Sequence, residues 1–156
     1  MEYFFNFDKM AYIKGKKPDG CILCLIRDSS SEVIDLTVYR SRYFITAVNL
    51  YPFNPGHLII FPKRHLLDIR EYTQEEEADL NNTHRKVIDA LDSLYSPAGY
   101  NLGYNMGKSA GASIDHLHQH IIPRHHRELG MADLIAGKRL LIESPVDTAK
   151  KLSAIL

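Results

Sequence analysis

The sequence predicts an α+β domain with an antiparallel sheet, one long helix and shorter helices. Several strand-like segments are separated by turns, and one segment has the length and pattern of a long helix. The chain has 156 residues, of which 45% are hydrophobic and 24% are charged, as is ordinary for a globular protein. Neither a linker nor a repeat divides it, so we expect a single domain over residues 1–156 with a short N-terminal extension.

The expected strands are short segments rich in apolar and β-branched residues. They are Cys24–Arg27, Val33–Val38, Phe44–Asn49, His57–Phe61, Asn101–Asn105 and His116–Ile122. Turn-forming residues separate several of them, at 28–31, 52–56 and 96–99. The strand that begins at His57 should end before Pro62, because proline has no N–H group to donate to a ladder. A further strand-like stretch covers residues 139–142.

The long helix is the clearest element. Thr73 and Glu76 have the spacing of a capping box, and apolar residues then recur mostly at helical spacing as far as Leu94. Ser96-Pro97 should end this helix. Shorter helices are expected at residues 65–71, at 131–136, and from Ser144 onward, with Pro145 at the first helical position and Asp147 in the first turn.

Charge and hydropathy argue against two classes of partner. Lys plus Arg and Asp plus Glu each number 19, so no basic excess indicates nonspecific nucleic-acid binding. No apolar run approaches the roughly 20 residues that span a membrane. Residues 1–5 lack the pattern of a signal peptide, and the two cysteines do not make a disulfide framework, so we expect a cytoplasmic protein.

Three histidines stand at alternate positions in the run from Asp115 to Arg124. In a strand, His116, His118 and His120 would share one face, with neighbours roughly 7 Å apart. Burying three imidazoles for packing alone is costly, so the row suits a metal site or phosphate chemistry. The alternative is a solvated strand or hydrogen-bonded core histidines; the small residues at 107–113 just before the run favour the functional interpretation.

This run resembles the signature of the histidine triad (HIT) family, and other parts of the chain are similar to the same family. They are Tyr12–Cys24, Tyr39–Asn49, Tyr51–His57, Phe61–His65 and the glycine-rich approach within Asn101–Arg124. The resemblance implies a meander-like sheet of about five strands with helices on one face, a homodimer and a nucleotide substrate.

Histidine chemistry explains the choice of nucleophile. A ring nitrogen can attack phosphorus to form a phosphoramidate, which water or another acceptor then breaks, with nearby donors stabilising the phosphate charge. We assign His118, the central histidine, as nucleophile; the resemblance implies that it attacks the α-phosphate of a nucleotide without needing a metal. His120 resembles the family's third histidine, which stabilises the phosphate, and His57 resembles another active-site histidine, with a structural strand histidine as the alternative.

Four further residues resemble the nucleotide-binding positions of the family. Asn49 resembles the residue that contacts the ribose region, and Asn105, Gly111 and Ser113 match the phosphate-binding loop. The alternative is simple turn chemistry, because Asn, Gly and Ser favour loops. Position 112 is Ala where many family members have Gln, which removes a side-chain donor near the leaving group.

Cys21 and Cys24 have the spacing of two ligands of a tetrahedral zinc site, which needs two more nitrogen or sulfur ligands. One branch of the family supplies these from positions that match His65 and His116, so the resemblance implies a structural zinc bound by all four residues. The alternatives are a redox pair, for which no suitable βαβ context follows, and two unligated cysteines.

The resulting functional prediction is a hydrolase that cleaves a nucleotide at its α-phosphate through a nucleotidyl-histidine and releases a nucleoside monophosphate such as AMP. Dinucleoside polyphosphates and nucleoside phosphoramidates are the two candidate substrate classes. One alternative is a nucleotidyltransferase or phosphorylase, in which phosphate replaces water as acceptor. Another is a nucleotide-binding regulatory protein in which catalysis is incidental.

Overall fold

The computed structural model describes residues 2–3, 18–130, 133, 135, 138–139 and 141–156. Its main element is a five-stranded sheet in the order β2-β3-β4-β6-β5, with every neighbouring pair antiparallel. The strands are β2 (Thr37–Arg40), β3 (Phe44–Val48), β4 (Leu58–Pro62), β5 (Gly99–Tyr104) and β6 (Gln119–Arg124). The α+β class with a sheet of about five strands is therefore confirmed.

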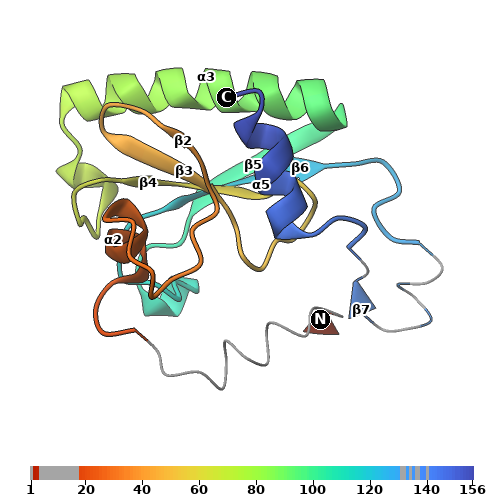
Figure 1. Ribbon diagram of the computed structural model, residues 1–156, viewed down its shortest axis with the longest axis horizontal. Coiled ribbons are helices and arrows are strands. Elements are labelled where there is room, and N and C mark those ends of the chain that lie inside the picture. Colours follow the sequence, from red (N-terminus) through yellow and green to blue (C-terminus); the bar gives the residue numbers. More distant parts are fainter. Residues whose placement is uncertain (1, 4–17, 131–132, 134, 136–137, 140) are drawn as a thin grey trace.

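A separate two-stranded parallel sheet joins residues 2–3 to residues 138–139. The strand β1 (Glu2–Tyr3) pairs with β7 (Lys138–Arg139), as Figure 1 shows near the N-terminus. The strand expected at 139–142 and the helical turn expected at 131–136 fall partly on residues outside those that the structure describes.

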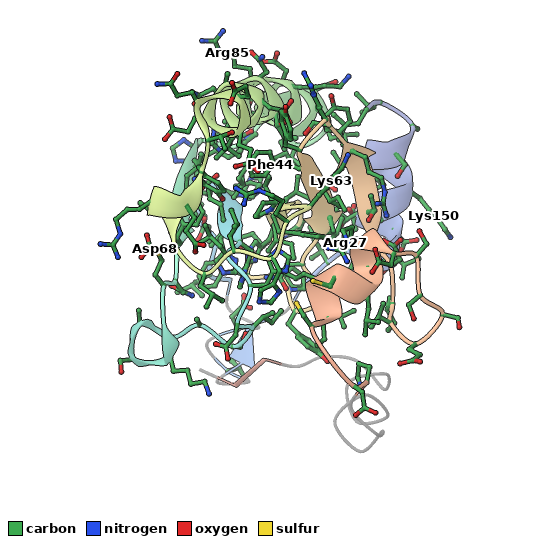
Figure 2. All side chains as sticks on the ribbon, turned by 90° about the vertical axis from the view of Figure 1, so that its left-hand side faces the viewer. Arg27, Phe44, Lys63, Asp68, Arg85 and Lys150 are labelled. Atoms are coloured by element: carbon green, nitrogen blue, oxygen red, sulfur yellow. The ribbon has the colours of Figure 1, made fainter. Side chains whose placement is uncertain are left out.

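Two helices cover one face of the main sheet (Figure 1). They are α3 (Gln74–Tyr95) and α5 (Pro145–Ser153). The larger core lies beneath them and consists of apolar side chains from the sheet and both helices, including Phe44, Val48, Leu58, Ile60, Leu80, Val87, Leu91, Ile121 and Leu152. Figure 2 shows Phe44 inside this layer and Arg85 pointing outward from α3. Because successive strand residues alternate between faces, the other half of the strand side chains point to the opposite face of the sheet.

The opposite face carries α2 (Ile22–Arg27) and a smaller core. Leu23 and Ile26 of α2 pack with four side chains of the central strands, Ile45, Ala47, Ile59 and Phe61. Helices therefore lie on both faces, rather than on one as the resemblance implied. The same face of the sheet, next to α2, holds the histidine side chains described below.

The strand expected over Cys24–Arg27 is wrong, because this segment belongs to α2. Leu23 and Ile26 are buried at a spacing of three residues, which places them on one side of a helix and not of a strand. The second expected strand begins later, at Thr37, and continues to Arg40. Pro62 belongs to β4 after all, at its last position, where its carbonyl oxygen accepts from His116.

The predicted starts of the two longer helices are confirmed. The Thr73 side chain accepts from the amide of Glu76 at 3.2 Å, and the Glu76 carboxylate accepts from the amide of Thr73 at 2.9 Å. The Ser144 side chain accepts from the amide of Asp147, and Pro145 occupies the first helical position. Ser96 ends α3 in the left-handed conformation.

Two short 3₁₀ turns complete the described part of the chain, η1 (Ile69–Glu71) and η2 (Lys108–Ala110). Only residues 69–71 of the short helix expected at 65–71 are helical. Within the described residues, no helix is both long enough and apolar enough to cross a membrane.

Candidate active site

The histidine run spans the start of β6 and does not lie wholly within it. The strand begins at Gln119, and residues 116–118 precede the ladder; the amide of Leu117 donates instead to the carbonyl of Leu66. The prediction of a strand over 116–122 is therefore wrong for its first three residues. His118 and His120 still share one cavity, with ring centroids 5.1 Å apart, whereas His116 is directed toward the two cysteines.

His118 is held by a backbone contact that determines which ring nitrogen carries its proton. Its Nδ1 lies 2.7 Å from the carbonyl oxygen of His116, and a carbonyl oxygen only accepts. The Nδ1 therefore carries the hydrogen and the Nε2 of the neutral ring has the free electron pair. Because the side chain is 4% exposed and lines the cavity, this is the geometry that a nucleophilic imidazole needs.

A second chain of contacts joins His57 to His120. The amide of Phe53 donates to His57 Nδ1 at 2.9 Å, so the hydrogen of the neutral His57 ring is on Nε2. That Nε2 lies 2.9 Å from His120 Nδ1 and donates to it. His120 Nδ1 is then an acceptor, and the remaining hydrogen of the His120 ring is on Nε2, available to a phosphate oxygen. Asn49 Nδ2 also lies 3.2 Å from His57 Nε2, but the Asn49 oxygen accepts from the amide of Tyr51, so both facing nitrogens are donors and this contact is not a hydrogen bond.

Burial keeps these two rings neutral. It lowers the pKa of His57 to about 3, and the positive charges that His120 and His118 would carry lower it further. Burial likewise lowers the pKa of His120 to about 4, with a smaller effect from His118. At neutral pH the direction of donation from Phe53 through His57 to His120 is therefore maintained.

All seven residues predicted for catalysis and nucleotide binding line one cavity of about 670 Å³. They are His57, His118, His120, Asn49, Asn105, Gly111 and Ser113. Gly111 has a φ of +91°, a conformation that side chains rarely adopt, so the loop before the histidine run requires glycine there. Gly111 and Ser113 of this loop line the cavity together with His118.

Several residues of the same cavity were not predicted from the sequence. They are Tyr51, Pro52, Phe53, Asn101, Leu102, Gly103, Tyr104 and Ile122. The strand pattern could have indicated Asn101 and Gly103, because they share the alternation of Asn105. The position of Phe53 depends on the conformation of the loop between β3 and β4; the turn-forming residues at 52–56 predicted a turn there but not which side chains line the cavity.

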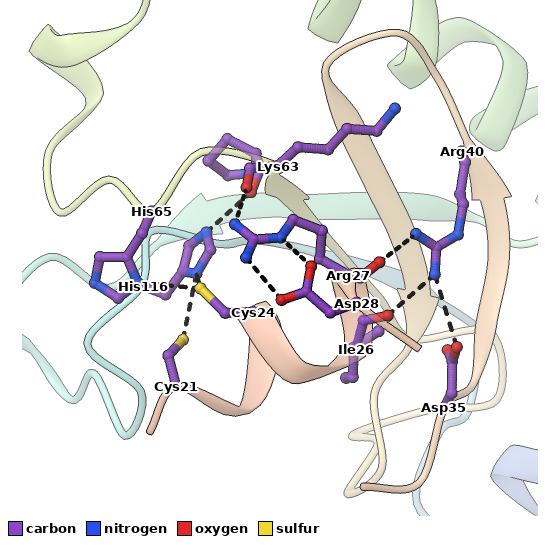
Figure 3. Close-up of polar contacts among 11 residues, drawn as sticks. Cys21, Cys24, Ile26, Arg27, Asp28, Asp35, Arg40, Lys63, His65 and His116 are labelled. Carbon is purple, nitrogen blue, oxygen red and sulfur yellow. Dashed lines mark hydrogen bonds and ion pairs between the residues drawn. The ribbon is translucent and has the colours of Figure 1, made fainter. Parts of the chain in front are cut away.

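The four predicted metal ligands come together at a second site. The ligand atoms of Cys21, Cys24, His65 and His116 all lie within 4.8 Å of one another. Cys21 Sγ and Cys24 Sγ lie 3.3 and 3.6 Å from His116 Nδ1, and Cys24 Sγ lies 3.4 Å from His65 Nδ1 (Figure 3). In a tetrahedral zinc site, ordinary bond lengths place sulfur and nitrogen ligands about 3.5 Å apart.

His116 has the orientation of a metal-binding ring. Its Nε2 lies 2.9 Å from the carbonyl oxygen of Pro62 and donates to it, so Nδ1 presents its electron pair to the cysteines. The side chain is 1% exposed and also packs edge-on against Phe61. The residues present therefore fit a tetrahedral metal ion. The same residue supports His118 through its carbonyl oxygen, so it belongs to both sites.

Comparison with known proteins identifies a family and several relatives that match the sequence of this chain. The sequence matches the family described as HIT domain over residues 30–127. It is 34% identical over 119 residues to a protein named AP-4-A phosphorylase from Mycobacterium tuberculosis, covering 76% of this chain and 61% of the relative. It is also 34% identical over 97 residues to a bis(5′-nucleosyl)-tetraphosphatase (asymmetrical) from Schizosaccharomyces pombe, covering 62% of this chain and 53% of the relative.

The fold has solved counterparts. A structure described as a hypothetical histidine triad nucleotide-binding protein from Sulfolobus tokodaii superposes with a TM-score of 0.69 at 26% identity, covering 86% of this chain and 90% of that one. The chain spans less than two thirds of the length of both named enzymes above. The family match nevertheless covers more than half of this chain and includes the histidine run and its glycine-rich loop. The chain therefore belongs to the HIT domain family.

Proposed function

We propose that this protein cleaves nucleotides at the α-phosphate through a covalent intermediate on His118. The observation that carries the proposal is the His118 ring itself. It is buried in the cavity, its Nδ1 donates to the His116 carbonyl at 2.7 Å, and its Nε2 is left with a free electron pair. Relatives named as a phosphorylase and as a tetraphosphatase of dinucleoside polyphosphates support the same substrate class.

The proposed reaction has two displacements at phosphorus. In the first, His118 Nε2 forms a bond to the α-phosphorus and the bond to the leaving phosphate oxygen breaks. The ring then carries a positive charge, which the His116 carbonyl stabilises at Nδ1–H. In the second, water attacks the same phosphorus, His118 leaves with its electron pair restored, and a nucleoside monophosphate is released.

His120 and His57 have supporting roles in this proposal. His120 Nε2–H donates to a phosphate oxygen, and His57 holds the His120 ring in the tautomer that permits this. Asn49, Asn105, Gly111 and Ser113 bind the ribose and phosphate groups, as their positions around the cavity support.

The second candidate function is phosphorolysis. The relative from Mycobacterium tuberculosis is named a phosphorylase, and it is 34% identical over the matched residues. In that reaction, inorganic phosphate replaces water in the second displacement and the product is a nucleoside diphosphate.

We also propose that Cys21, Cys24, His65 and His116 bind zinc. Two thiolates and two imidazoles are a donor set that zinc accepts in structural sites, and the 3.3–3.6 Å separations support tetrahedral geometry. Bound zinc supplies a cross-link between α2 and the segment before β6 and takes no part in the displacement. His116, one of these four residues, also orients His118, because its backbone carbonyl oxygen accepts from His118 Nδ1.

The proposed assembly is a homodimer formed through β5. This strand is at the edge of the sheet, and its neighbouring apolar side chains Leu102 and Met106 are 43% and 40% exposed. Light scattering of the wild-type protein should give twice the chain mass, and Leu102→Glu should reduce it to the mass of one chain. A wild-type mass of 17.8 kDa would contradict the dimer.

The test of the function is a product assay with diadenosine tetraphosphate. Hydrolysis at an α-phosphate gives AMP and ATP in phosphate-free buffer, whereas phosphorolysis gives ADP and ATP and requires added phosphate. His118→Ala should lower kcat by roughly 10⁴-fold or more, whereas His126→Ala, at an exposed histidine, should retain wild-type turnover. Equal turnover by the His118→Ala and wild-type proteins would contradict the proposed nucleophile.

A further inference from the structure

A second cavity meets the first at the histidines. Its volume is about 690 Å³, and it shares five lining residues with the first cavity, Asn49, Tyr51, Ser113, His118 and His120. Beyond this shared wall, the first cavity extends over β5 and the second extends beneath α2. A molecule that reacts at His118 therefore has two separate spaces available to its two ends.

The two cavities differ in chemistry. The second is lined largely by apolar side chains, among them Ile22, Ile26, Val33, Ile59 and Ile114, with Asp115 as a carboxylate at its wall. Such a surface suits an uncharged nucleoside. The described lining of the first cavity includes no carboxylate and has three asparagine amides together with the phosphate-binding loop. It therefore suits the end of the molecule with more phosphate groups.

The backbone leaves open space in the first cavity beside His120. Gly103 of β5 stands directly opposite His120 of β6, so the two residues share one face of the sheet. A Cβ atom added at Gly103 would meet nothing within 4 Å. Among the residues that the structure describes, the space above this glycine is therefore open, next to the His120 ring that we propose donates to the phosphate.

From these observations we propose that the cavity over Gly103 receives the leaving nucleotide of a dinucleoside polyphosphate. The inference rests on the proposed function and names its substrate class. The retained nucleoside occupies the apolar cavity beneath α2, its α-phosphate lies at His118, and the polyphosphate with the second nucleoside extends over β5. When the His118–phosphorus bond forms, the leaving nucleotide departs with the bridging oxygen and its electron pair. Substrates with a small leaving group use only the apolar cavity and the shared wall.

The test compares substrates that differ in the leaving group. Diadenosine tetraphosphate has a nucleotide as leaving group, whereas adenosine 5′-phosphoramidate has only ammonia. Gly103→Val adds a side chain into the space over β5, and Gly99→Val is the matched control. Gly99 lies on the same strand and face, its added Cβ would also meet nothing within 4 Å, and it does not line the cavity.

For each protein, kcat/KM is measured with both substrates, and the ratio of the dinucleotide value to the phosphoramidate value is compared. Gly103→Val should lower this ratio at least 10-fold, mainly through a higher KM for the dinucleotide, and Gly99→Val should leave it within twofold of wild type. An unchanged ratio in Gly103→Val, or an equal fall for both substrates, would overturn the inference. Failure of the wild-type protein to turn over either substrate would overturn the proposed function itself, which is a distinguishable result.

Discussion

The backbone amide of Phe53 donates to Nδ1 of His57 at a distance of 2.9 Å. Phe53 is outside the histidine run, in the loop between β3 and β4, yet this contact determines where the hydrogen of His57 resides. The hydrogen on His57 Nε2 then determines the tautomer of His120, 2.9 Å away. A loop amide thus orients the ring that we propose to stabilise the phosphate.

This relay predicts a difference between two substitutions of His57. A glutamine amide can reach the position of Nε2 and donate to His120, whereas an asparagine amide reaches only the position of Nδ1. We expect His57→Gln to retain roughly 10-fold more kcat than His57→Asn, the equivalent of about one hydrogen bond. Steady-state kinetics of both variants measures this, with thermal unfolding as the control for folding. Equal kcat values would show that donation to His120 does not matter.

The partly buried ring of His120 predicts a loss of stability in acid. The folded pKa of His120 is about 4, below its ordinary value of about 6.5, so between these pH values the unfolded chain binds more protons. The free energy of unfolding should therefore fall as the pH is lowered from 7 to 5, and His120 should contribute about 1 to 2 kcal/mol of that fall.

Urea denaturation at the two pH values measures this contribution. His120→Gln should show a smaller loss between pH 7 and pH 5 than the wild-type protein, because glutamine does not titrate. His126→Gln is the control, since His126 is exposed. An identical loss in the His120→Gln and wild-type proteins would contradict the assignment of a neutral buried ring.

The metal cluster predicts that stability depends on zinc. Elemental analysis should find one zinc per chain, and a chelator should lower the Tm of the wild-type protein. At free zinc 100-fold above Kd the bound metal contributes about 3 kcal/mol. His65 is the ligand to replace, because its side chain is exposed and its loss removes little packing. His65→Ala should have a Tm that no longer responds to chelator, whereas His126→Ala should respond like wild type.

Gly56 predicts a large cost for a single methyl group next to His57. Its φ is +79°, and an added Cβ would lie 3.0 Å from Leu91, 3.1 Å from Tyr95 and 3.2 Å from Pro123. Gly56→Ala should therefore lower the free energy of unfolding by about 3 kcal/mol, from backbone strain and overpacking together.

A substitution at Gly20 separates the cost of backbone strain from the cost of overpacking. Its φ is +97°, but an added Cβ would meet nothing within 4 Å. Gly20→Ala should cost only the backbone strain, about 1 to 2 kcal/mol. Chemical denaturation of both variants tests the pair, and equal costs would show that the contacts around Gly56 relax.

Capping residues and long periodic patterns made the helices α3 and α5 predictable from the sequence. Thr73 with Glu76, and Ser144 with Pro145, act within one turn of the chain, so they predict a helix start without any information about distant contacts. Residues 24–27 were not predictable in this way. A short apolar run suits a strand or a helix equally, and the choice of helix depends on Leu23 and Ile26 packing against strands far along the chain.

The predicted site residues could be gathered from the sequence because the family resemblance supplied them as a set. The resemblance also predicted that Cys21, Cys24, His65 and His116 come together, but local sequence patterns did not predict how the histidines divide between the two sites. Period two places His116 on the same side as His118, but the folded chain directs it to cysteines more than 90 residues away. The roles of Phe53 and Gly103 depend on a loop conformation and on the pairing of two strands, neither of which a local pattern encodes.

The pairing of β5 with β6 also has a consequence for errors in strand alignment. Leu102 stands opposite Ile121 and Gly103 opposite His120. If β5 slipped by one residue, every side chain would change faces, and Leu102 or Tyr104, depending on the direction of the slip, would stand over the cavity where the glycine leaves space. Such a molecule would keep the other four strands and their core while rejecting large substrates. The ratio of kcat/KM for a large and a small substrate would therefore reveal misaligned molecules, whereas a thermal unfolding curve would not distinguish them from native ones.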